Sequence, residues 1–163
     1  MKKTITIFLA LTILVGCGQR NAGTTCAKAE RFGEWSECLE IGDALIDKQH
    51  RELFEFIIDV IEMSENGADG DLLAEMLMEI VTHTVQHFND EEALKQRVGF
   101  TEFNCHKKIH EEFKLTAVAL VEAFEESGRC AEVLADALEN IVLPWVKKHI
   151  TEEDLKIKTY IKN

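Results

Sequence analysis

The sequence predicts an all-α protein, an up-down-up-down antiparallel four-helix bundle over residues 35–163. Apolar residues recur at helical spacing throughout residues 42–161. Three short breaks, rich in glycine and polar residues, divide this stretch into four long segments. Because short connections between long helices make neighbours antiparallel, the four segments are expected to form one bundle.

Each predicted helix is bounded by one of these breaks, which fall near residues 66–70, 98–101 and 126–129. The first and third segments carry clear apolar stripes, which are Leu53, Phe56, Ile57, Val60 and Ile61 in the first and Phe113, Val118, Leu120, Val121 and Phe124 in the third. The fourth segment contains Pro144. Proline inside a helix removes a backbone hydrogen bond, so Pro144 is expected to kink this helix or to mark its true start.

Five of the six histidines, together with two acidic residues, have spacings that suit metal ligands. His87 and Glu91 are four residues apart, so both project from one face of a helix. Counted from the breaks at about 1.5 Å per residue, candidates on all four helices lie roughly 10–15 Å from the same end. Imidazole and carboxylate ligands suit iron, zinc or copper. The candidate set is His50, His87, Glu91, His106, His110, His149 and Asp154.

Two residues near this set have more than one interpretation. Glu153 lies four residues after His149 and would share its helix face, whereas Asp154 is five residues on and turned by about 500°. His83 continues the stripe of His87. It is expected either to orient a ligand by hydrogen bonding or to be ordinary packing.

Four motifs then resemble one known family, the hemerythrins and their bacterial relatives. They run from about Trp35 to the C-terminus and fill all seven ligand positions. The motifs are Trp35 with Ile41-Gly42 and Ile46-Asp47-Lys48-Gln49-His50, then His87-Phe88-Asn89-Asp90-Glu91-Glu92, then Cys105-His106-Lys107-Lys108-Ile109-His110, and last Trp145-Val146-Lys147-Lys148-His149-Ile150 with Asp154. The resemblance favours Asp154 over Glu153 as the fourth-helix carboxylate.

The resemblance implies two iron ions in unequal surroundings, bridged by an oxo or hydroxo group and by Glu91 and Asp154. One iron would be held by the three histidines of the third and fourth helices, which are His106, His110 and His149. The other would be held by His50 and His87, with an open position for O₂. By the same resemblance, an apolar O₂ pocket is lined by Trp145, Val146 and Ile150.

The function expected from these residues is reversible O₂ binding, for storage, delivery or scavenging. Other di-iron bundles place a Glu-x-x-His pattern on each of two helices, and this chain contains none. An enzyme that reduces peroxide or nitric oxide, and a sensor of O₂ or redox state acting through a partner protein, are the alternatives. The formal net charge of −12 argues against nucleic acid as a partner.

The N-terminus predicts export and lipid attachment. Lys2-Lys3 precedes a mostly apolar stretch, Thr4 to Val15, that is too short for a usual transmembrane helix. Leu14-Val15-Gly16-Cys17 resembles a bacterial lipobox. Residues 1–16 would then be a lipoprotein signal peptide, Cys17 the lipidated residue and 17–34 a tether, and the bundle is expected at the outer membrane, facing the periplasm. An uncleaved anchor and an ordinary cleaved signal peptide are the alternatives.

Export permits disulfides among the four remaining cysteines, Cys26, Cys38, Cys105 and Cys130. Cys105 and Cys130 are about 35 Å or more apart along a helix, which is beyond disulfide reach. A bond between Cys26 and Cys38 or between Cys38 and Cys105 stays open, and Cys105 could instead be a small buried hydrophobe.

Overall fold

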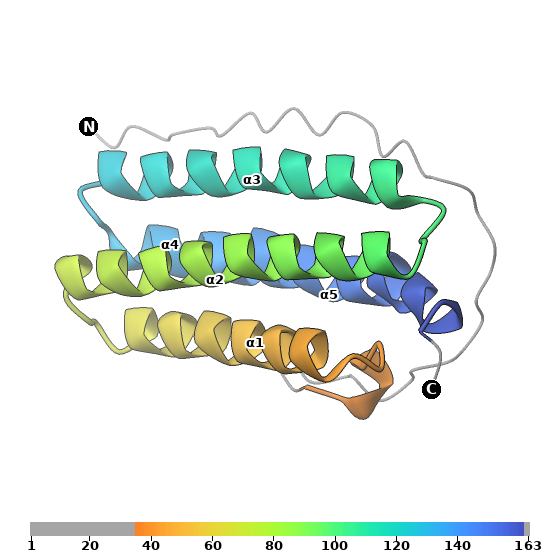
Figure 1. Ribbon diagram of the computed structural model, residues 1–163. Helices are drawn as coiled ribbons and strands as arrows, with labels where there is room; N and C mark the ends of the chain where they lie inside the picture. Colours follow the sequence, from red (N-terminus) through yellow and green to blue (C-terminus); the bar gives the residue numbers. More distant parts are fainter. Residues whose placement is uncertain (1–34, 162–163) are drawn as a thin grey trace.

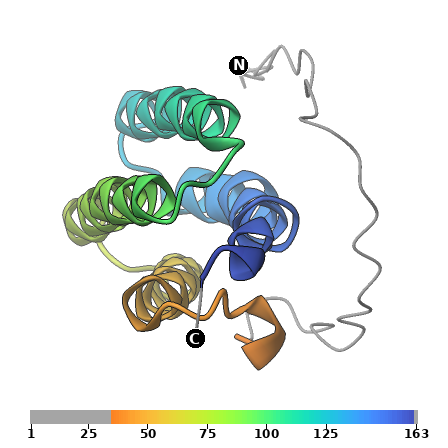
Figure 2. The same ribbon diagram turned by 45° about the vertical axis from the view of Figure 1, so that its right-hand side comes forward.

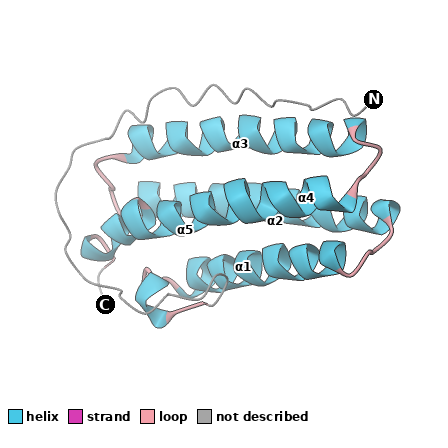
Figure 3. Cartoon of the chain, turned by 180° about the vertical axis from the view of Figure 1, so that it is seen from behind, coloured by secondary structure: helices cyan, strands magenta, loops and turns pink. Residues whose placement is uncertain are grey.

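A computed structural model of the chain describes residues 35–161, and all regular structure in that range is helical (Figure 3). The expected signal peptide 1–16 and tether 17–34, with Cys17 and Cys26, lie outside the described residues. The elements are η1 (Glu37–Leu39), α1 (Ala44–Glu65), α2 (Gly70–Arg97), α3 (Phe103–Glu126), α4 (Ala131–Ala137), η2 (Leu138–Val142), α5 (Leu143–Glu152) and η3 (Asp154–Thr159). The predicted all-α class is confirmed.

The helices form the expected bundle. Successive helices run in opposite directions in Figure 1, where α4, η2 and α5 follow one another as a single fourth helix. Viewed closer to its axis in Figure 2, the bundle shows α1 and α3 on opposite sides. Helix α1 contacts α2 and α4, and α3 contacts the same two helices. The up-down-up-down arrangement is therefore confirmed.

Helix ends fall at the predicted breaks because the sequence supplies caps there. Asp43 accepts hydrogen bonds from the backbone N–H groups of Leu45 and Ile46, which would otherwise lack partners in the first turn of α1. Gly99 follows α2 with φ of +70°, a left-handed conformation that glycine adopts without steric cost. These local signals fix where α1 starts and α2 stops.

The fourth helix starts earlier than Pro144 suggested. It begins at Ala131 and contains a π-helical segment, η2, directly before α5. Pro144 lies in the first turn of α5, where its missing N–H is accommodated by the wider turn that precedes it. Pro144 thus marks the start of α5, as one of the two predictions had it, but not the start of the fourth helix, and the departure from α-helical geometry before it is a π segment.

Two apolar clusters leave a polar layer between them. The larger cluster fills most of the bundle and includes Phe54, Phe88 and Leu138. The smaller cluster closes the end where α1 begins and α2 ends, and its buried members are Ile41, Ile46, Leu94 and Ile157. Within residues 35–161, no helix is long and apolar enough to cross a membrane.

The described cysteines are placed at both ends of the bundle. Cys105 is half-buried and disulfide-bonded, so the interpretation as a small buried hydrophobe is wrong. Cys38 is exposed, and the partly exposed Cys130 donates to Glu132 at 3.3 Å. Pairings that involve Cys26 lie outside the described residues, and the connectivity stays a prediction.

Asp47 ties the segment before α1 to the helix. Its carboxylate accepts hydrogen bonds from the backbone N–H groups of Ile41 at 2.6 Å and Gly42 at 3.0 Å. The side chain is 9% exposed, so water does not readily replace these bonds. These hydrogen bonds hold the segment that contains Ile41, a member of the smaller apolar cluster, against the start of α1.

Replacing Asp47 by alanine should lower the free energy of unfolding by roughly 1–3 kcal/mol, because the buried N–H of Ile41 and the partly buried N–H of Gly42 lose their acceptor. Urea unfolding of the metal-free chain measures this change. Asp59→Ala, at an exposed position on the same helix, is the control and should change it by no more than about 0.5 kcal/mol. Equal effects of the two substitutions would contradict the proposed role of Asp47.

Candidate metal centre

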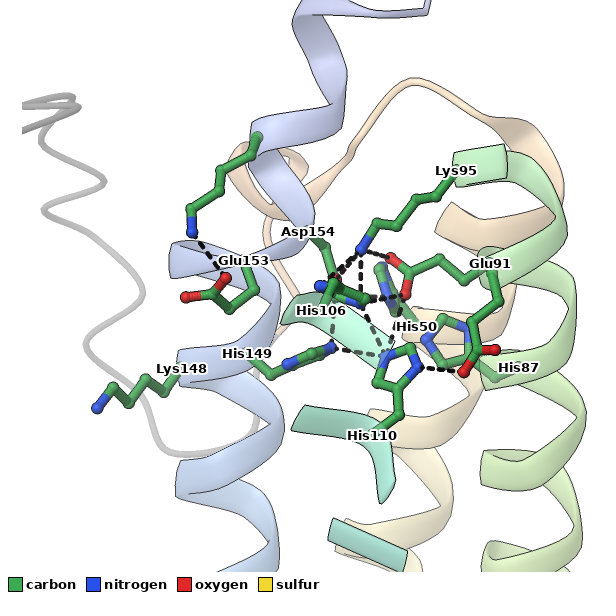
Figure 4. Close-up of polar contacts among 12 residues, drawn as sticks. His50, His87, Glu91, Lys95, His106, His110, Lys148, His149, Glu153 and Asp154 are labelled. Carbon is green, nitrogen blue, oxygen red and sulfur yellow. Dashed lines mark hydrogen bonds and ion pairs between the residues drawn. The ribbon is translucent and has the colours of Figure 1, made fainter. Parts of the chain in front are cut away.

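All seven side chains predicted to bind metal meet at one level of the bundle (Figure 4). They come from every helix of the bundle and lie near the end where α1 and α3 begin and α2 and α5 end. None is more than 5% exposed. The residues are His50 on α1, His87 and Glu91 on α2, His106 and His110 on α3, His149 on α5 and Asp154 at the start of η3. The common depth expected from residue counting is therefore observed.

The donor atoms divide into two groups of unequal size. One group is Glu91 with His106, His110 and His149, and the other is His50 with His87 and Asp154. Within each group all donor atoms lie within 4.8 Å of one another. The Nε2 atom of His110 is 2.9 Å from that of His106 and 3.1 Å from that of His149. Such spacings suit atoms bonded to one ion at about 2.1 Å.

The end of the fourth helix decides between the two acidic residues considered there. Helix α5 ends at Glu152, and Asp154 begins a tighter 3-10 helix, so the angle expected from a continuous α-helix does not apply. Asp154 Oδ1 lies 3.2 Å from His149 Nε2. Glu153 instead pairs with Lys156 at 2.7 Å, away from the donor atoms. The structure thus brings Asp154, and not Glu153, into the cluster.

Hydrogen bonds to neighbouring side chains set the orientation of His87. The Gln49 side-chain amide donates to Asp90 at 2.7 Å, so the Gln49 carbonyl oxygen is free to accept. That oxygen lies 3.3 Å from His87 Nδ1, which must therefore carry the proton. Nε2 of His87 is left with a lone pair directed into the cluster.

His110 is held in the same way by a carboxylate. Its Nδ1 lies 3.1 Å from Glu92 Oε1, and Glu92 also pairs with Lys107 at 3.1 Å. A carboxylate accepts, so Nδ1 donates and Nε2 of His110 offers its lone pair to the cluster. Spacing alone did not single out Gln49 or Glu92 for these roles, although both belong to the recognised motifs.

His83 combines the two roles that were considered for it. Its Nε2 donates to the backbone carbonyl of Gln49 at 2.9 Å, and its ring packs edge-on against Phe56. Gln49 in turn contacts His87. His83 therefore acts on the candidate ligand His87 only through Gln49.

The electrostatic surroundings favour the neutral form of His87 and His106 and the charged form of Glu91 and Asp154. Burial lowers the pKa of His87 well below its ordinary value, and nearby His50 lowers it further. Burial also lowers the pKa of His106. For Glu91 and Asp154, burial would raise the pKa, but Lys95 and the contacting histidines outweigh it and hold both values low. Neutral imidazole and ionised carboxylate are the forms that bind metal.

Lys95 is a residue of the centre that sequence reasoning missed. It is fully buried, and its ammonium pairs with Glu91 and Asp154, each at 2.9 Å. The signal that could have found it is its position four residues after Glu91, on the same face of α2.

The predicted O₂-pocket residues lie beside the cluster. Val146 and Ile150 are buried in the larger apolar cluster. The Trp145 ring stacks on His149 with 4.5 Å between centroids, and on Phe113 at 3.7 Å. All three positions thus face the donor layer or the core next to it, and O₂ binding there stays a prediction.

The residues present fit bound metal by their own chemistry. The Nδ1 atoms of His50 and His149 have no hydrogen-bond partner, and His50 Nε2 faces Asp154 Oδ2 at 3.4 Å. The converging Nε2 atoms of His106, His110 and His149 have too few protons to satisfy one another, because His110 has its proton on Nδ1. Buried lone pairs of this kind carry a desolvation cost that a cation removes.

A four-helix bundle that buries this histidine-rich donor set at one level belongs to the class of non-haem metal-binding bundles. The sequence model of the hemerythrin HHE cation binding domain matches residues 41–161. The chain belongs to the hemerythrin family and is a non-haem iron-binding protein.

Three bacteriohemerythrins with similar sequences agree with this assignment. The chain is 30% identical over 120 residues to a bacteriohemerythrin of Pseudomonas paraeruginosa, a match that covers 74% of this chain and 75% of the relative. A bacteriohemerythrin of Campylobacter jejuni is 28% identical over 122 residues, which cover 75% of this chain and 90% of the relative. One from Stenotrophomonas maltophilia is 28% identical over 120 residues, or 74% of this chain and 75% of the relative.

The metal-free chain should lose unfolding free energy as the pH falls. Below about pH 6.5, His87 and His106 bind protons in the unfolded chain but stay neutral in the folded chain, because folding lowers their pKa. Below about pH 4.5, Glu91 and Asp154 likewise bind protons in the unfolded chain while they stay ionised in the folded chain. Each group contributes up to about 1.4 kcal/mol per pH unit. Urea unfolding between pH 7.5 and pH 5 measures the slope. His87→Gln should flatten it, and an unchanged slope in that variant would contradict the assignment.

Proposed function

We propose that the chain holds two iron ions in this cluster, joined by an oxo or hydroxo bridge, and binds O₂ reversibly. The observation that carries the proposal is the unequal division of donor atoms. One group has three imidazoles and a carboxylate, whereas the other has two imidazoles and a carboxylate. The smaller group leaves room for an external ligand at its ion, and the iron supplies the electrons that O₂ binding requires.

The side chains around the cluster suit an uncharged, apolar ligand. A cavity of about 370 Å³ lies between α2 and α3 and reaches Phe113 and Val142 in the core. Its lining is almost entirely apolar and includes Leu77, Ile80, Leu120, Val121 and Leu138. Phe113 stacks on Trp145, which stacks on His149. The pocket is partly open to solvent, since Met78, Val85 and Val118 in its lining are exposed, and its apolar walls suit small apolar molecules better than charged ones.

The hydrogen bonds of Gln49 and Glu92 contribute by fixing which nitrogen of His87 and His110 carries the proton. A fixed tautomer keeps each Nε2 lone pair in place whether or not the external ligand is present. Burial of the whole set limits the access of water and protons to the reaction. These features favour release of O₂ over its further reduction.

We also propose that the protein acts at the bacterial cell envelope, attached through lipid on Cys17. The support is the lipobox-like Leu14-Val15-Gly16-Cys17 after an apolar stretch. The partners would be O₂ and the membrane. An iron enzyme that reduces peroxide or nitric oxide, and a sensor acting through a partner protein, use the same donor set and are separated from the carrier by experiment.

The test is the visible absorption spectrum of the full-length chain, loaded with ferrous iron under nitrogen, exposed to air and then purged. A charge-transfer band should appear with O₂ and disappear on purging. His50→Ala and His87→Ala should each abolish the band, because each removes one of the two imidazoles of the smaller group. His83→Gln is the control and should retain it, because His83 reaches the cluster only through Gln49.

A band that fades to a stable oxidised form would favour the enzyme or the sensor. Turnover of peroxide or nitric oxide would then indicate the enzyme, and a partner recovered in only one redox state the sensor. Normal oxygenation of His50→Ala or His87→Ala would refute the assignment of the smaller group.

Cys17→Ser should release the protein from the membrane and leave its iron content unchanged, because this residue would carry the lipid and lies outside the bundle. Membrane fractionation and iron analysis of cells that express each form measure both properties. A Cys17→Ser protein that still carries lipid would contradict the lipobox assignment.

A further inference from the structure

Lys95 has surroundings unlike those of the other cationic side chains. Its ammonium lies 2.9 Å from Glu91 Oε1 and 2.9 Å from Asp154 Oδ1, and it is near both ring nitrogens of His106, at 2.6 Å from Nε2 and 3.0 Å from Nδ1 (Figure 4). Within residues 35–161 it is the one buried lysine or arginine, and it is fully buried. Phe100 packs against it, with Nζ 5.5 Å from the ring centroid. This position is therefore held by its contacts and is not a surface conformation.

The energetics of burial explain why the ammonium is placed there. An isolated buried charge is strongly unfavourable, and a buried pair is tolerated only when its hydrogen-bonding capacity is met. Glu91 and Asp154 come from α2 and η3, and both are fully buried. Without a cation between them they would repel each other in a medium of low dielectric constant. Lys95 supplies that cation from the chain itself.

The atoms that Lys95 contacts are the atoms that a metal needs. Glu91 and Asp154 are the candidate bridging carboxylates, and His106 belongs to the larger donor group. A neutral imidazole has one lone pair, on one ring nitrogen. The lone pair of His106, on whichever ring nitrogen it lies, therefore cannot accept from the Lys95 ammonium and bind a metal at the same time.

We infer that Lys95 is an internal cation that takes the place of metal between Glu91 and Asp154 in the metal-free protein and is displaced when iron binds. The inference deepens the proposed iron site and rests on it. Lys95 thereby has two opposite effects. It stabilises the empty fold, and it lowers the affinity for metal, because part of the binding energy is used to move the ammonium.

The test compares Lys95→Met with Lys148→Met in the full-length chain. Methionine keeps the length of the apolar stem and removes the charge. Lys148 is exposed beside His149 and is 3.8 Å from Glu152, so its loss removes the same charge from near the site without touching the donors. Two quantities are measured for each form: the melting temperature without metal, and the affinity for ferrous iron under nitrogen, by competition with a chelator.

Without metal, Lys95→Met should melt at least about 5 °C lower than the wild type, because two buried carboxylates lose the cation between them. It should also bind ferrous iron at least about tenfold more tightly, because no ammonium has to be displaced from the ligands. Lys148→Met should change neither quantity beyond about 1 °C and twofold. A metal-free Lys95→Met chain that is as stable as the wild type, or one that binds iron equally or less well, would overturn the inference.

A measurement on the wild type covers the case in which Lys95→Met does not fold without metal. The side-chain ammonium signal of Lys95, observed by NMR in chain labelled with ¹⁵N-lysine, should shift or disappear when zinc, a diamagnetic ion, is added. An unchanged signal on a zinc-loaded protein would overturn the inference alone. Failure of the wild type to bind either iron or zinc would instead refute the proposed metal site, and the inference with it.

Discussion

The structure depends on one constraint: seven side chains that can bind metal are buried at one level of a bundle whose interior is mostly apolar. Each buried lone pair or charge has to be matched by a proton, a cation or a metal ion, or the fold loses stability. Gln49 and Glu92 meet part of this demand by accepting the Nδ1 protons of His87 and His110. The remaining unmatched atoms, on His50 and His149 above all, are those that point to metal.

The arrangement of the helices determines whether the layer of donor side chains forms. Four helices contribute at least one donor each, so the layer forms only when the bundle is assembled with each helix at the correct depth. The smaller apolar cluster and the Asp47 contacts then close the nearby end. A slip of one residue in any helix would rotate its donor by about 100° and remove it from the layer. Packing and metal site therefore specify each other.

The sequence was sufficient for the features that follow from regular helical geometry. Breaks rich in glycine and polar residues, such as residues 98–101, mark helix ends locally, and four-residue spacings place donor pairs on one face, so both were predicted correctly. The cap that Asp43 provides at the start of α1 was not predicted. Departures from regular geometry were not predicted. The π segment before Pro144 and the change to a 3-10 helix at Asp154 depend on tertiary packing. Lys95 was missed because an i,i+4 pair with Glu91 is typical of an exposed helix face, although the prediction of Glu91 as a ligand already placed that face toward the interior.

Lys95 also bears on the order of folding and metal binding. With two carboxylates in its interior, the bundle without any cation would carry two uncompensated buried charges, and folding would then require iron. An internal ammonium lets the bundle close first and accept metal afterwards, at some loss of affinity. The proposed export as a lipoprotein separates folding from the cytoplasmic iron supply. A protein at the envelope would therefore have to fold before it binds iron, which the Lys95 ammonium makes possible. On this argument, Lys95 connects two independent features of the chain, the proposed lipobox and the candidate metal centre.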